Sequence, residues 1–259
     1  MTATLALVLV LGLLIGGLLG LLGGGGSILA VPALVYVAGL PLDEAIPTSL
    51  LVVGLASAAA VLPRLRQVRW RLAGIFAATG AAAAVAGAAV NRLLDPALVL
   101  LGFAGVMVAA AVRLLRGGDD VGGSCSLPGG GVDWRSCLPK AAASGVVVGF
   151  LTGLFGVGGG FLIVPALTLL LGLPMAAAAA TSLVVIATNA AVAFTAHLSH
   201  GTISLPITLA FAAAAVVGSV VAGRHATRLD GERLRRSFAY LVLGTAAYTA
   251  VHASWTVIT

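Results

Sequence analysis

The chain has 259 residues, of which 60% are hydrophobic and only 8% are charged, and its mean hydropathy is +1.15. A soluble domain carries about a quarter charged residues, so this composition excludes a water-soluble globule and indicates an integral membrane protein. The apolar runs are too long for strands and do not alternate strictly, which favours spanning helices over a barrel. The net charge of +6 lies in short loops. There it reports orientation in the lipid bilayer and not nucleic-acid binding.

The first half of the chain is predicted to contain five apolar runs, of which the first is long enough to cross the bilayer and the second is short. Inverted repeats require an odd number of crossings per half, so the short run is expected to pair with a neighbour as a broken or hairpin helix, and the number of full crossings stays open. The first run has no basic region before it, so we interpret it as a retained helix and not as a signal peptide. The short run follows a group of glycines and covers only about half of the membrane at a helical rise. The predicted helices are about 3–22, 28–38, 45–62, 72–90 and 96–115.

The second half repeats this plan after a polar stretch that contains both cysteines, Cys125 and Cys137. Glycine and aspartate dominate residues 116–139, which are predicted to form a mobile linker with no domain of its own. The two cysteines are expected to be reduced thiols in a loop. A lone pair at this spacing does not make a metal site. The predicted helices of the second half are about 140–155, 161–171, 175–196, 205–222 and 237–255.

An internal repeat relates the two halves. Each half contains a run of glycines, then an apolar stretch that ends in proline, at Pro32 and at Pro165 (165 − 32 = 133). We interpret this as a tandem duplication, with transmembrane repeat 1 at 1–115, a cytoplasmic linker at 116–139 and transmembrane repeat 2 at 140–259. The same offset also pairs rarer residues: Gly39 with Gly172, Pro41 with Pro174, Thr48 with Thr181, and Ser49 with Ser182.

The arginines predict how the halves are oriented. Arginine-rich loops at 63–71 and 224–236, and the linker between the halves, are expected in the cytoplasm. The loop 197–204 has no Lys or Arg and is expected outside, although the offset makes it the counterpart of 64–71. Equivalent loops on opposite faces predict an all-α polytopic membrane protein built from two inverted-topology repeats. Each repeat is expected to contain a Gly-rich broken helix.

The glycine breaks are the predicted functional site. Unwound backbone inside a membrane is tolerated only where protein or a water-filled cavity satisfies it, and broken helices in inverted repeats are typical of secondary transporters. A helix start after each break would direct N–H groups at a small anion, and glycine lets that anion approach the backbone. The predicted backbone donors are Gly25, Gly26, Ser27, Gly158, Gly159 and Gly160, and the predicted side-chain contacts are Thr48, Ser49, Thr181, Ser182 and Asn189.

A structural interpretation of the same residues stays open. Serine and threonine often bond to their own helix, and Gly-x-x-x-Gly is common in helix packing. An intramembrane enzyme with Ser27 as nucleophile and His197 as base is not predicted, since each residue occurs in only one half. No catalytic residue, metal site or cofactor is predicted. The glycine runs fit neither a phosphate-binding loop nor a dinucleotide-binding fingerprint. A membrane assembly partner without transport of its own is a further alternative.

The glycine pattern followed by Pro32-Ala33-Leu34, Gly39-Leu40-Pro41 and Thr48-Ser49-Leu50 resembles the sulfite exporter TauE/SafE family, and the second half carries a matching copy. The resemblance covers nearly the whole chain outside the linker. It implies a multi-pass permease of the bacterial cell inner membrane that moves sulfite or organosulfonate anions, or thiosulfate in some members, as a secondary carrier.

We therefore expect a transporter, and not an enzyme, that exports sulfite or an organosulfonate by alternating access. The alternative is an anion channel, or a carrier for another small anion such as thiosulfate or a carboxylate. The expected partners are the sulfur-containing anion and the lipid bilayer, and a homodimer is left open. Val157 stands where the first half has Gly24, and Gly160 where it has Ser27. The two half-sites are thus unlike, which suits a sulfonate with an organic tail.

Overall fold

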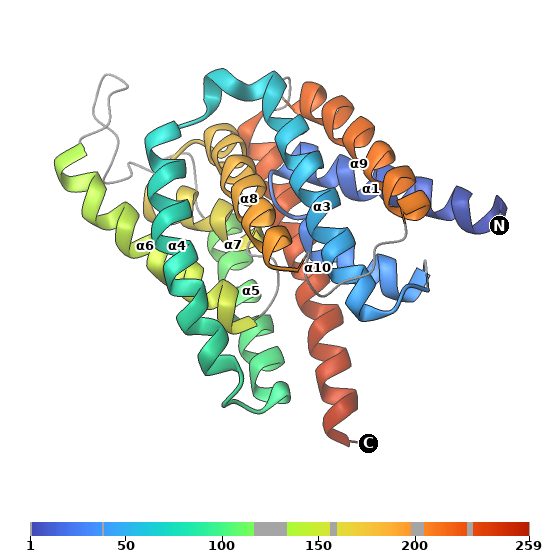
Figure 1. Cartoon of the computed structure of the whole chain (residues 1–259). Helices are drawn as coiled ribbons and strands as arrows, with labels where there is room; N and C mark the ends of the chain where they lie inside the picture. Colours follow the sequence, from blue (N-terminus) through green and yellow to red (C-terminus); the bar gives the residue numbers. More distant parts are fainter. Residues whose placement is uncertain are drawn as a thin grey trace. The chain divides into compact units, whose positions relative to one another are not determined.

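The computed structural model describes residues 2–37, 39–116, 134–155, 160–197, 205–226 and 230–258 (Figure 1). All regular structure in this part of the chain is helical, which confirms the predicted all-α class. Every predicted run is a helix, and the two short runs divide into an α-helical and a π-helical part. The elements are α1 Thr2–Leu22, α2 Ser27–Pro32, η1 Ala33–Val37, α3 Leu42–Val61, η2 Leu62–Gln67, α4 Trp70–Asn91, α5 Pro96–Arg116, α6 Trp134–Phe155, α7 Gly160–Pro165, η3 Ala166–Leu170, α8 Met175–His197, α9 Leu205–Ala226 and α10 Gly231–Ile258.

Several helices are long and apolar enough to cross a bilayer. Within the described residues, five segments meet this condition by length and composition, and two apolar helices are shorter. The chain is therefore a multi-pass membrane protein. The five segments are Glu44–Gln67, Trp70–Asn91, Cys137–Phe155, Met175–Thr195 and Pro206–Ala226, and the shorter ones are Ala6–Leu22 and Gly160–Leu170.

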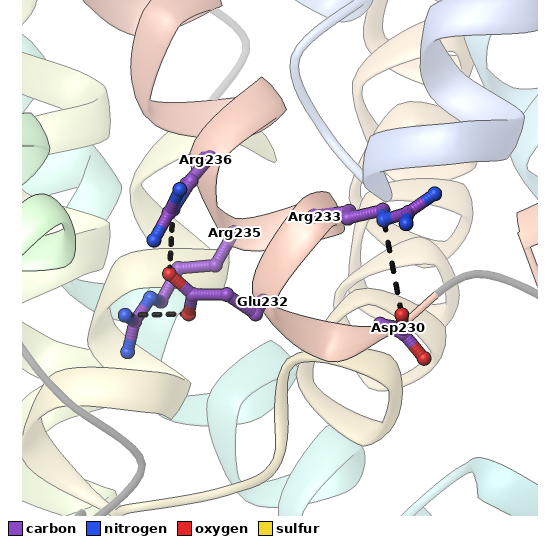
Figure 2. Close-up of polar contacts among 5 residues, drawn as sticks. All are labelled: Asp230, Glu232, Arg233, Arg235 and Arg236. Carbon is purple, nitrogen blue, oxygen red and sulfur yellow. Dashed lines mark hydrogen bonds and ion pairs between the residues drawn. The ribbon is translucent and has the colours of Figure 1, made fainter.

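Two stretches predicted as arginine-rich loops are largely helical. Residues Leu62–Gln67 form a 3₁₀-helix, and α10 begins at Gly231, so three of the arginines expected in a loop lie in its first turns. Figure 2 shows why this turn is stable: Glu232 forms ion pairs with Arg235 Nη2 at 2.6 Å and Arg236 Nε at 2.7 Å. Pairs three and four residues apart lie on one helix face and support it. The hydrogen bond from Arg236 lowers the pKa of the Glu232 carboxyl below its ordinary value.

The predicted linker is shorter than expected at its second end. Helix α6 begins at Trp134, so 134–139 belong to it, and residues 117–133 lie outside the described part. Cys137 is fully buried and disulfide-bonded. The expectation of two reduced thiols is therefore wrong. Sequence spacing excluded a metal site but could not show whether the chain brings a partner thiol within bonding distance.

The described helices form two compact units, and each unit takes segments from both halves of the sequence. The first unit is 1–73 with 179–229, and the second is 74–178 with 230–259. In the first unit, α1 packs along α9, and α3 also packs on α9 (Figure 1). In the second unit, α5 packs along α10.

Glycines allow the closest helix contacts in both units. In the first, a Cβ added to Gly16 or Gly20 of α1 would overlap the backbone of Ala215 or Ser219 in α9. In the second, a Cβ added to Gly149 or Gly153 of α6 would overlap the backbone of α4. These glycines serve helix packing. By the offset of 133, α6 corresponds to α1 and α9 to α4, so in each unit the first helix of one half packs on a later helix of the other half.

The two halves of the chain share a local backbone geometry after Pro32 and Pro165. Pro32 and Pro165 are each followed by five residues of π-helix, and the chain then turns at Gly39 (φ +69°) or Gly172 (φ +67°). Proline removes one helical N–H donor, which loosens the ladder at this point. The turn is closed by a matching hydrogen bond in each half, from Leu40 N–H to Leu34 O (3.1 Å) and from Leu173 N–H to Leu167 O (3.0 Å).

Candidate functional site

The first glycine break lies between α1 and α2. The last helical bond of α1 runs from Gly23 N–H to Leu19 O (2.9 Å), and Gly23 then takes a left-handed conformation with φ +76°. All four glycines of the break are buried. The Ser27 amide and hydroxyl both donate to Gly24 O, at 3.3 and 2.8 Å. The apolar run is therefore interrupted by a short, buried and ordered stretch of non-helical backbone.

The amides within this break lack partners. Among the described residues, we find no hydrogen bond from the backbone N–H groups of Gly24, Gly25 and Gly26. More than nine in ten buried backbone N–H groups in proteins are paired, so three in succession are unusual. Glycine leaves such donors accessible to a ligand, because no side chain covers them. This arrangement can bind an anion.

Arg64 caps a carbonyl at the C-terminal end of α1, where the left-handed Gly23 stops the helix. In a continued α-helix, Gly20 O would accept the amide of Gly24. Instead, Arg64 Nη2 donates to Gly20 O, and its Nε and Nη2 each lie 3.4 Å from Gly223 O near the end of α9. Carbonyls at helix C-termini carry partial negative charge and favour a cation. Arg64 thus replaces a helical bond and leaves the Gly24 amide without its acceptor.

The sequence pattern did not identify this role of Arg64. We interpreted it with the neighbouring arginines as an orientation signal, yet only 2% of Arg64 is exposed, whereas Arg66 is exposed. A possible signal is its position directly after Pro63, at the end of a long apolar run, where an arginine can fold back onto the helix ends.

The four predicted hydroxyl groups are buried, and each has a protein partner. Ser182 Oγ lies 2.5 Å from Gly23 O and 2.9 Å from Ala179 O, and its single O–H is shared between these two carbonyls, so it contacts the break directly. Thr181 Oγ1 accepts the Arg69 amide at 3.1 Å. In the first half, Thr48 Oγ1 lies 3.4 Å from Thr208 Oγ1, and Ser49 Oγ donates to Ile46 O at 2.7 Å. Contact of these hydroxyls with an anion stays a proposal.

The remaining predicted site residues divide into three groups. Gly25, Gly26 and Ser27 lie in the first break, and a Cβ at Gly26 would crowd Ile15 and Leu19. Gly160 is buried at the start of α7, whereas Gly158 and Gly159 lie outside the described residues. Asn189 is half-buried on α8. Across the described residues, no group of three His, Cys, Asp or Glu side chains could hold a metal ion.

Aromatic side chains flank the second break. The Phe103 ring packs edge-to-face on Phe155 at 5.3 Å and on Phe161 at 5.2 Å between ring centroids. Phe155 ends α6, and Phe161 is the second residue of α7, so both border the second glycine run. Their counterparts in the first half are Leu22 and Ile28. Sequence analysis missed this aromatic cluster because Phe103 lies far away in the chain.

Removing the Ser182 hydroxyl should destabilise the protein. Ser182→Ala leaves the buried Gly23 carbonyl without this donor, and we expect a loss of about 1–3 kcal/mol in the free energy of unfolding. Ser49→Ala is the matched control, since its hydroxyl bonds within its own helix. Thermal unfolding of the purified variants in detergent measures the difference. Equal melting temperatures for the two variants would contradict a structural role for the Ser182–Gly23 bond.

The fold and the break together define a class. A multi-pass helical chain with a buried, non-helical glycine segment is typical of secondary membrane transporters. The family model described as Sulfite exporter TauE/SafE matches residues 8–249. The chain therefore belongs to the sulfite exporter TauE/SafE family, and it is a membrane transporter and not an enzyme.

The curated relatives agree with this class. A "Probable membrane transporter protein" of Xylella fastidiosa (strain Temecula1) is 33% identical over 250 residues, which is 93% of each chain. "Probable membrane transporter protein YunE" of Bacillus subtilis is 29% identical over 239 residues, 82% of this chain and 85% of the relative. A probable membrane transporter protein of Methanocaldococcus jannaschii is 28% identical over 177 residues, 64% of this chain and 62% of the relative. No solved structure gives a significant match.

Proposed function

We propose that this transporter exports sulfite or an organosulfonate, with the anion bound at the glycine breaks. One observation carries the proposal: the buried amides of Gly24, Gly25 and Gly26 have no partner among the described residues. Successive backbone N–H groups form concavities that suit oxyanions. The description of the matching family model supports a sulfur oxyanion as the substrate. The amides of Gly158, Gly159 and Gly160 are the proposed donors in the second half.

The proposed donors bind by hydrogen bonding. Backbone amides hold an oxyanion through hydrogen bonds and carry no formal charge themselves. Asn189 and the hydroxyls of Thr48, Ser49, Thr181 and Ser182 are proposed to adjust this site, by direct contact or by holding the backbone as Ser182 does. The unlike flanks of the breaks, aliphatic in the first half and aromatic in the second, suit an anion with a polar head and an organic tail.

We propose that transport follows alternating access of two inverted repeats in the bacterial inner membrane. A membrane potential that is negative inside favours the exit of an anion by about 2.3 kcal/mol per charge per 100 mV. Export therefore needs no further coupling ion. Whether two copies of the chain assemble as a homodimer is a separate proposal that the transport mechanism does not require.

An anion screen tests the proposed substrate. The melting temperature of the purified protein is measured with sulfite, thiosulfate, sulfoacetate, sulfate and acetate, and we expect sulfite or sulfoacetate to raise it most. A ligand present at 100 times its dissociation constant stabilises the native state by about 2.7 kcal/mol. Counterflow in proteoliposomes then separates a carrier, which shows trans-stimulation, from a channel. Stabilisation by acetate alone would contradict a sulfur-anion substrate.

Cysteine labelling tests the inverted arrangement. Arg66→Cys and Gly201→Cys, at roughly equivalent positions of the two repeats, should react with a membrane-impermeant maleimide from opposite sides. Right-side-out and inside-out vesicles are compared, with the unsubstituted chain as the control. Labelling of both positions from one side would contradict inverted repeats.

The same labelling decides the absolute orientation. The arginines predict Arg66 inside, whereas a disulfide at Cys137 is more typical of an oxidising compartment than of the cytoplasm. If the arginine-rich loops lie in the cytoplasm, residue 201 lies outside, and Gly201→Cys reacts with the maleimide in right-side-out vesicles. If the start of α6 lies outside, the pair exchanges sides, and the inverted relation between the repeats is kept.

A further inference from the structure

One buried cationic group has an unused donor. Arg64 is 2% exposed, and among the residues that the structure describes its Nη1 has no hydrogen-bond partner. Buried arginines usually pair with carboxylates. In the described part of the chain, however, no ion pair includes Arg64. A buried charged donor without a partner is available to a water or an ion.

The existing partners of Arg64 hold it in place but do not neutralise it. Nε and Nη2 donate only to the backbone carbonyls of Gly20 and Gly223, near the C-terminal ends of α1 and α9. These helix ends offer partial negative charge and no carboxylate. The guanidinium thus remains a cation whose remaining donors can be used by a ligand, and its planar shape fixes the direction of those donors.

The unused donor belongs to a side chain that bonds the last turn of α1, just before the first glycine break. Nη1 shares the planar guanidinium with Nη2, which bonds Gly20 O, the carbonyl that Gly24 N–H would reach in a continued helix. The amides of Gly24, Gly25 and Gly26 follow immediately along the chain, and they have no partner among the described residues either. A side-chain cation therefore bonds the last turn of α1, and three backbone donors follow that turn along the chain.

We propose that Arg64 is the cationic residue of the transport site and that its Nη1 binds the transported oxyanion together with the amides of this break. This inference rests on the proposed function and deepens it, because it assigns the charge recognition to one side chain. With Nε and Nη2 held by carbonyls, the fork keeps Nη1 in a fixed plane, and the two N–H groups of Nη1 suit a ligand with several acceptor oxygens, such as sulfite or a sulfonate. The offset pairs Arg64 with His197, so only the first half supplies an arginine.

Substitutions of Arg64 and its exposed neighbour test this assignment. Sulfite affinity is measured from the dependence of the melting temperature on sodium sulfite, for the full chain in detergent. We expect Arg64→Gln to weaken sulfite binding about tenfold or more, since a hydrogen bond to a charged group is lost. Arg64→Lys keeps the charge but not the fork, and it should weaken binding at least about threefold. The matched control Arg66→Gln, two residues away and exposed, should bind sulfite like the wild type.

Each outcome has one meaning. If Arg64→Gln melts at a lower temperature without sulfite but keeps the wild-type affinity, Arg64 only caps the helices and the inference is overturned. If the glutamine variant does not fold, the lysine variant decides, and unchanged affinity there overturns the fork contact. Failure of the proposed function would show in the wild-type protein itself, because sulfite, thiosulfate and sulfoacetate would then not raise its melting temperature.

Discussion

Gly16→Ala should lower the stability of the protein strongly, whereas Gly17→Ala, one residue further along the same helix, should not. The added Cβ at residue 16 would overlap the backbone of Ala215, and backbone atoms cannot rotate away as a flexible side chain can. Overpacking of this kind costs about 1–3 kcal/mol, and sometimes more. At Gly17 the space is open, and alanine in a helix interior is favoured over glycine by about 0.5–1 kcal/mol.

Thermal unfolding of the two variants in one detergent measures this contrast. The equivalent substitution in the second half, Gly149→Ala, should behave like Gly16→Ala, because its Cβ would overlap the backbone of Gly80. Equal melting temperatures for Gly16→Ala and Gly17→Ala would show that α1 and α9 are not in close backbone contact.

Gly23→Ala should abolish most transport, with a loss of at least about tenfold in the rate. Residue 23 has φ +76°, and its Cβ would also overlap the backbone of Ala179. A left-handed conformation alone costs an alanine about 1–2 kcal/mol. The overlap adds to this cost and forces the break to move, so the carbonyl that Ser182 holds and the amides that follow are displaced.

Gly39→Ala is the matched control for this prediction. Its φ of +69° is similar, but no atom lies within contact distance of an added Cβ. It should lose stability through backbone strain while keeping most of the transport rate per folded protein. Proteoliposome counterflow, normalised to the folded fraction, compares the two variants. Equal rates would contradict a role for the geometry of the break in transport.

The helices could be predicted because their signals are local. Apolar runs of about twenty residues, interrupted by glycine and proline, give the helix positions directly. The offset of 133 predicted corresponding positions, and the backbone repeats them in the turns at Gly39 and Gly172. The helical start of α10 was missed, because ion pairs around Glu232 stabilise a turn that charge alone marks as a loop.

The partners of the site residues could not be predicted, since they come from distant helices. The Arg64 contacts with Gly20 and Gly223, and the Ser182 contact with Gly23, join residues far apart in the sequence. Charge patterning treats all arginines at a membrane boundary alike. Arg64 is buried and Arg66 is exposed, and a single sequence does not show which of two neighbouring arginines is buried.

The exchange of helices between the halves has a consequence for biogenesis. Helix α1 leaves the ribosome first, but its close neighbour α9 is synthesised almost two hundred residues later. During insertion, Gly16 and Gly20 of α1 therefore face lipid or the insertion machinery until α9 has been synthesised. A gene cut within 117–133 should yield fragments that are degraded when produced singly and that reassemble when produced together.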